Sequence, residues 1–94
     1  MPKDKSNKRL ETLREELRGI DDEIIRLVVK RMDIVRGIGA AKRAVGAAVF
    51  DDEREAFNRK HSKDVAAGAL PGPLVDELTD LLAKWARDLQ EKAK

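Results

Sequence analysis

The chain has 94 residues, enough for one domain, and it contains no cysteine and a single histidine, His61. The absence of cysteine excludes a disulfide framework and a thiolate metal site, and one histidine cannot build a zinc or iron site unaided. Charged residues make up 40% of the chain, yet 20 Lys and Arg against 18 Asp and Glu leave a net charge of only +2. We therefore expect a single domain over residues 1–94 with no metal and no cofactor.

Charge and aromatic content also limit the partners that the chain can bind. Both signs of charge are interspersed, and the aromatic residues are Phe50, Phe57 and Trp85 alone, so neither a basic surface nor a stacking platform for nucleic acid is evident. Residues 1–9 are polar with no apolar stretch of signal length behind them, and no run approaches the length of a membrane span. The sequence predicts a cytoplasmic protein that binds neither nucleic acid nor membrane.

The first predicted element is one very long helix. Apolar positions recur with alternating spacings of three and four from Leu10 to Val45, which is typical of an amphipathic helix. Ser6 or Asn7 suits the N-cap, and Gly46 suits a left-handed residue at the C-terminal end. We expect a helix from residue 8 to about residue 44, preceded by a flexible segment over residues 1–6.

Two glycines, Gly37 and Gly39, lie inside this pattern, and each weakens a helix by about 1 kcal/mol relative to alanine. A break there would give an ordinary antiparallel helical bundle, but a continuous helix is the simpler interpretation. Such a helix would be roughly 55 Å long, whereas a compact monomer of this size has a radius of gyration of about 12 to 13 Å. Its apolar stripe would need a second chain, so we expect a homodimer.

Two shorter helices are predicted after the long one. The second opens at Asp51 or Asp52, whose carboxylates suit an N-cap and the helix dipole, and runs to about residue 65. One of its faces carries Phe50, Arg54, Phe57 and His61. Residues 66–73 hold two prolines and two glycines, which indicates a loop. The third helix, from Leu74 to about Glu91, presents one broad apolar side: Leu74, Leu78, Leu81, Leu82, Trp85 and Leu89. No strand pattern appears, so the predicted fold class is all-α with three helices per chain.

Two cations on the long helix are candidates for ligand binding. Arg31 lies on the apolar stripe beside Leu27 and Ile34, where an unpaired charge is costly to bury. It either pairs with a carboxylate of the protein or binds an anionic ligand. Lys42 lies about 16 Å further along the axis and within about 20° of the same direction, so both cations could converge on one small molecule. Taken alone, Lys42 resembles a solvated lysine near a helix C-terminus.

Arg14 precedes Arg31 by seventeen residues, so on a straight helix it lies about 25 Å away and is turned roughly 100° aside. One chain cannot bring both arginines to a small ligand. In a dimer with antiparallel long helices, however, Arg14 of the partner subunit could reach a pocket near Arg31, and symmetry would create two equivalent sites. Taken alone, Arg14 is a surface residue of a charged helix.

The remaining candidates are weaker when taken singly. Asp51, Arg54 and Glu55 lie within about one helical turn, and an N-cap aspartate with local ion pairs explains Asp51 well and the other two less well. Gln90 is an amide among charged residues, ordinarily a solvated position. No catalytic triad, Gly-rich phosphate loop or metal motif competes with this set.

The order and spacing of these residues resemble the all-helical chorismate mutase family over nearly the whole chain. The matching segments are residues 13–21, Arg31, residues 39–42 and residues 51–55. The family pattern carries over as Arg14, Arg31, Lys42, Asp51, Arg54, Glu55 and Gln90. One turn before the glutamine, where the family usually has a small hydroxyl residue, this chain has Ala86, which removes one expected hydrogen bond to the substrate.

The resemblance implies an intertwined dimer and the rearrangement of chorismate to prephenate, a pericyclic Claisen reaction without a cofactor. The protein would then be an isomerase of the shikimate pathway and aromatic amino acid biosynthesis. Arg31 and Arg14 of the partner subunit would bind the two carboxylates of the substrate. Lys42 and Gln90 would donate to the ether oxygen as its bond breaks. Glu55, helped by the backbone near Asp51, would accept from the ring hydroxyl, and Arg54 would organise this turn.

Three alternatives remain open at this point. An isochorismate pyruvate lyase shares the arginines, the lysine and the glutamine, and residues 31–35 are similar to it, although Asp51 and Glu55 favour the mutase. A mutase of 4-amino-4-deoxychorismate is the second, because paired acids suit an ammonium group. The third is a non-catalytic helical dimerisation module whose charged residues only set the register.

Overall fold

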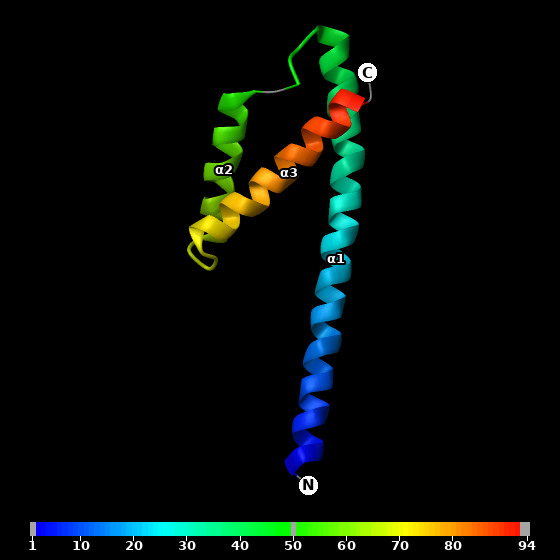
Figure 1. Cartoon of the computed structure of the whole chain (residues 1–94), viewed down its shortest axis with the longest axis vertical. Coiled ribbons are helices and arrows are strands. Elements are labelled where there is room, and N and C mark those ends of the chain that lie inside the picture. Colours follow the sequence, from blue (N-terminus) through cyan, green and yellow to red (C-terminus); the bar gives the residue numbers. More distant parts are fainter. Residues whose placement is uncertain (1, 50, 93–94) are drawn as a thin grey trace. The chain divides into compact units, whose positions relative to one another are not determined.

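The computed structural model describes residues 2–49 and 51–92, with side chains from residue 7 onward. Three helices follow one another in chain order: α1 (Pro2–Val45), α2 (Asp52–Ala66) and α3 (Gly72–Lys92) (Figure 1). The residues described contain no strand, which confirms the predicted all-α class with three helices. Within these residues, no helix combines the length and the apolar character that crossing a membrane requires. The chain divides between Arg31 and Met32 into two units, and each is described by itself.

The first unit is the part of α1 that ends at Arg31. Its helix begins at Pro2, so the predicted start at residue 8 is wrong, and Ser6 and Asn7 lie inside the helix instead of capping it. Proline suits the first turn of a helix, because its backbone angle is already helical and its missing N–H has no partner there anyway. No glycine or proline follows until Gly19, so nothing stops the helix before the stripe begins.

The apolar stripe of the first unit is uncovered in a single chain. Its large apolar side chains keep 45–63% of their surface exposed: Leu10, Leu13, Leu17, Ile20, Ile24 and Leu27. Residues that are exposed singly need no explanation, but a continuous row of apolar side chains marks a contact surface.

The second unit begins with the last part of α1, which continues through Gly37 and Gly39 as predicted. The helix ends where Gly46 adopts a left-handed conformation with φ of 69°, which confirms the predicted cap. The Gly46 N–H donates to the carbonyl of Arg43 (3.3 Å), and the Ala47 N–H donates to the carbonyl of Lys42 (2.8 Å). These two bonds satisfy the last carbonyls of the helix and turn the chain back toward it.

Helix α2 starts as the sequence predicts. The Asp51 carboxylate accepts from the backbone N–H of Arg54 at 3.1 Å and caps the helix. Along one face, the Arg54 guanidinium lies 5.8 Å from the Phe57 ring centre, and the Phe57 and His61 rings stack with 5.9 Å between centres. This confirms the predicted shared face for these three residues, whereas Phe50 lies outside the described residues. The helix ends at Ala66.

Helix α3 begins at Gly72, two residues before the predicted start, because Pro73 suits a first helical turn and does not end the loop. It runs from the end of α2 back to the last part of α1 (Figure 1). Val35 of α1 and Val75 and Gln90 of α3 are buried at 4–6% exposure, and Gly39 of α1 is also buried. The predicted broad apolar side divides, because Leu74, Leu78, Leu81 and Trp85 remain 46–53% exposed.

Candidate functional site

Lys42 is held at the C-terminal end of α1. Its side chain is half-buried, and its Nζ donates to the carbonyl oxygen of Val49 at 2.8 Å. The turn at Gly46 brings Val49 back over the lysine. An ammonium group has three donors, so two remain for a ligand after the bond to Val49. The cation is therefore oriented by the chain and keeps the capacity to bind.

Gln90 packs closely against the same part of α1. A Cβ atom added at Gly39 would lie 3.2 Å from the Gln90 Cγ, which is tight, and 3.6 Å from its Cα, so the absence of a side chain at Gly39 permits this close approach. The glutamine is 6% exposed, and its Oε1 has no hydrogen-bond partner among the described residues. A buried polar atom without a partner costs about 1 to 3 kcal/mol, which is uncommon unless a ligand or another chain satisfies it.

Lys42 and Gln90 belong to the same small region. Gly39 and Lys42 are three residues apart on α1 and are therefore neighbours on the helix surface. Gln90 packs on Gly39, one turn before Lys42 on α1. Ala86, half-buried and one turn before Gln90 on α3, occupies the same side of that helix and offers only a methyl group. Lys42 and the contact of Gln90 thus belong to neighbouring turns of α1.

Each predicted residue of the acidic turn at the start of α2 has a partner within the chain. Asp51 caps the helix, and its backbone carbonyl accepts from the Glu55 N–H at 3.0 Å, so its side chain is engaged in the fold. Arg54 is exposed and lies over the ring of Phe57. Glu55 is half-buried, and its Oε1 lies 3.8 Å from the Nε of Arg87. Of the predicted residues in this turn, Glu55 is the one that reaches toward α3.

Arg87 is a residue of this region that the sequence did not single out. It is half-buried, adjacent to Ala86 and three residues before Gln90. Its spacing from Gln90 on a helix was the available signal, but arginine is common on helix surfaces and the signal is weak. Only the packing of α3 against α2 shows that it pairs with Glu55.

The other two predicted arginines belong to the first unit and are described there. Arg14 is exposed, and its Nη1 lies 3.2 Å from the Glu11 Oε1, one turn earlier on the same helix. Such exposed pairs contribute about 0.2 to 0.5 kcal/mol and are easily exchanged for another anion. Arg31 is exposed in the single chain. Lys42, Gln90, Ala86 and the α2 turn all belong to the second unit, whereas Arg14 and Arg31 belong to the first.

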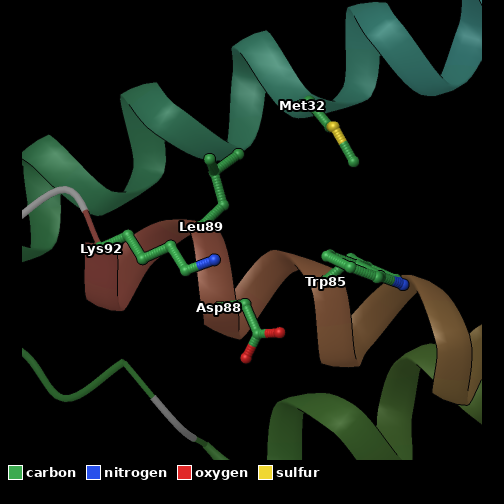
Figure 2. A pocket seen from close by; sticks show the side chains of 5 residues that line it. All are labelled: Met32, Trp85, Asp88, Leu89 and Lys92. Carbon is green, nitrogen blue, oxygen red and sulfur yellow. The ribbon is translucent and has the colours of Figure 1, made fainter.

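A shallow hollow lies on another side of α3, and none of the predicted site residues lines it. Its walls are Met32, Trp85, Asp88, Leu89 and Lys92. Met32 projects from α1 toward Trp85, and Leu89 points at α1 (Figure 2). The lining is mostly apolar and the hollow is open to solvent, so it offers no convergent set of polar groups. Throughout the part of the chain that the structure describes, no group of three or more His, Asp or Glu residues is arranged to hold a metal ion.

Comparison with known proteins gives one match. A family model described as chorismate mutase type II matches residues 13–91. This span contains all of the predicted site residues, from Arg14 to Gln90. No curated protein and no solved structure matches the chain significantly.

Proposed function

We propose, from the premise that this chain belongs to the chorismate mutase type II family, that it catalyses the rearrangement of chorismate to prephenate. The observation that carries the proposal is the cation of Lys42, whose Nζ is held by the carbonyl of Val49 and keeps two donors for a ligand. Gln90 adds a buried amide that packs on Gly39, one turn before Lys42 on α1.

The reaction suits such a site because it needs no nucleophile and no proton transfer. A Claisen rearrangement is accelerated by binding the folded conformer and by stabilising the charge that develops on the ether oxygen. Two free donors of the Lys42 ammonium and the amide NH₂ of Gln90 supply this stabilisation in our proposal. The bond from Lys42 to Val49 matters because a preorganised donor does not need to reorient during the reaction.

The carboxylates of chorismate need further cations, which leads to the dimer. Val35 and Val75 are the buried apolar residues of the described chain, while the stripe of α1 and the row on α3 are exposed. Such a small core cannot stabilise a chain of this size, since one-sided apolar helices gain stability only when a partner covers them. We propose an intertwined homodimer in which Arg31 and Arg14 of the partner subunit bind the two carboxylates.

The α2 turn would bind the ring of the substrate. In the proposed complex, Glu55 accepts a hydrogen bond from the ring hydroxyl, while Asp51 and Arg54 keep this turn in shape. Ala86 contributes a surface without a hydrogen bond, so the binding of the substrate relies on the charged groups. The cytoplasmic location and the role in aromatic amino acid biosynthesis expected from the sequence belong to the same proposal.

Loss of chorismate absorbance, with the products separated, tests the function directly. Wild-type protein is expected to form prephenate, and Lys42→Ala is expected to lower kcat at least about 100-fold, because removing one preorganised donor to a developing charge costs roughly 3 kcal/mol. The matched control is Lys60→Ala, which removes an exposed lysine of α2 and should leave kcat unchanged.

The products separate the alternatives. Conversion of isochorismate to salicylate and pyruvate, without turnover of chorismate, would replace the mutase by the lyase. A wild-type protein that converts neither chorismate, isochorismate nor 4-amino-4-deoxychorismate would support the non-catalytic dimerisation module.

A further inference from the structure

A cation–carboxylate pair between α2 and α3 lies at the edge of the proposed site. The Arg87 Nε lies 3.8 Å from the Glu55 Oε1, and the two side chains are 38% and 23% exposed. A pair that is partly shielded in this way interacts more strongly than a fully exposed one and less strongly than a buried one. The Glu55 carboxylate therefore carries the influence of a positive charge before any ligand arrives.

This pair departs from the pattern of the other ion pairs between the same helices. Lys63 lies 3.0 Å from Asp76, and Arg59 lies 2.8 Å from Asp80, so α2 supplies the cation and α3 the acid in both pairs. The two pairs are one turn apart in this antiparallel register.

The next step of that register would place Glu55 opposite Lys84. The Lys84 Nζ lies instead over the ring of Trp85, 5.8 Å from its centre. Arg87, from a position further along α3, takes the place beside Glu55, and the polarity of the pair is reversed. The pair thus uses the residue one turn beyond the register position, and this residue lies beside Ala86 and one turn before Gln90.

We propose that Arg87 determines the substrate preference of the site, by making Glu55 favour a neutral ring hydroxyl over a ring ammonium. The inference rests on the proposed function, in which Glu55 accepts from the ring substituent. A hydroxyl donates one hydrogen bond to the carboxylate and adds no charge, so it is compatible with the guanidinium. An ammonium would share the carboxylate with Arg87, and the two cations would repel each other.

The size of the effect follows from the geometry. Two cations that flank one carboxylate are separated by about 6 Å, and with an effective dielectric constant of about 20 their repulsion corresponds to roughly 100-fold in affinity. Because more than a third of Arg87 is exposed, solvent screening lowers this preference to about tenfold.

The test is the ratio of kcat/KM for 4-amino-4-deoxychorismate to kcat/KM for chorismate. Arg87→Met is expected to raise this ratio about tenfold, whereas Arg87→Lys keeps the charge and should raise it by less than about threefold. Loss of a cation also weakens the binding of any dicarboxylate, but this effect is common to both substrates and cancels in the ratio. The matched control is Arg59→Met, which removes the Arg59–Asp80 pair between the same helices and should leave the ratio unchanged.

The outcomes separate this inference from the function on which it rests. Turnover of chorismate with an unchanged ratio in Arg87→Met overturns the role of Arg87 and leaves the mutase proposal intact. A wild-type protein that converts neither substrate overturns both. If circular dichroism shows that Arg87→Met is unfolded, Arg87→Gln is measured in its place, since it is also neutral and keeps hydrogen-bonding groups.

Discussion

The close approach of Gln90 to Gly39 makes a sharp prediction about one methyl group. A Cβ added at Gly39 would lie 3.2 Å from the Gln90 Cγ, 3.6 Å from the Gln90 Cα and 3.6 Å from the Arg43 Nη1. The two contacts at 3.6 Å are ordinary, but the 3.2 Å approach to the Gln90 Cγ is tight, and this atom must move by a few tenths of an ångström. Gly39→Ala therefore forces either a change in the Gln90 rotamer or a small displacement of α3.

Gly37 provides the matched control, because it lies on the same helix and a Cβ added there would meet nothing within 4 Å. Both alanine variants gain about 1 kcal/mol of helix propensity. Gly37→Ala should keep this gain, whereas overpacking at Gly39 costs about 1 to 3 kcal/mol, as in other crowded cores. We expect Gly39→Ala to be about 1 to 3 kcal/mol less stable than Gly37→Ala, with the difference arising from the contact with Gln90 alone.

Urea unfolding at one fixed protein concentration measures the stability difference, and kcat measures the position of the amide. The concentration must be fixed because the stability of the proposed dimer depends on it. Gly39→Ala should lower kcat about tenfold or more, since in the proposed reaction a displaced donor loses part of its interaction with the ether oxygen. Gly37→Ala should match the wild type. If both variants show the same stability and the same kcat, the packing of Gln90 on Gly39 does not position the proposed donor.

Two further predictions concern pH and assembly. Gln90 does not titrate, so wild-type turnover should be nearly flat between about pH 6 and 8. The Gln90→Glu variant should lose turnover as the pH rises, because only the protonated carboxyl group can donate to the ether oxygen. A pH–rate profile of the variant that stays flat would rule out this donor role. Ile24→Glu places a charge on the exposed stripe of α1 and should convert the proposed dimer to monomers in analytical ultracentrifugation and abolish turnover. Glu23→Gln at the neighbouring position should change neither. Full activity of a monomeric Ile24→Glu protein would contradict the shared site.

Much of the helical architecture is determined by signals within a few residues of one another. The spacing of apolar residues specifies α1 through Gly37 and Gly39, and the cap at Asp51 and the left-handed Gly46 involve hydrogen bonds to residues three to five positions away. The predicted start of α1 was wrong because two local signals compete there. Ser6 and Asn7 suit a cap but are overridden by a helix that already starts at Pro2, because isolated polar residues do not stop a helix.

The order of residues along the chain likewise indicates the candidate residues, but it does not indicate what each of them contacts. Nothing near Gln90 in the sequence indicates that it is buried, and its burial depends on the approach of α3 to a residue without a side chain, Gly39. Nothing near Glu55 indicates a cation, since Arg87 belongs to another helix.

The sequence by itself therefore determined the three helices, the end of α1 and the start of α2, because periodicity and caps act along one chain segment. Tertiary structure alone decided that Gln90 is buried against Gly39, and that Glu55 is paired with Arg87. The physical reason is that burial and cross-helix pairing depend on how closely two helices approach, and this distance is set by side chains far apart in the sequence.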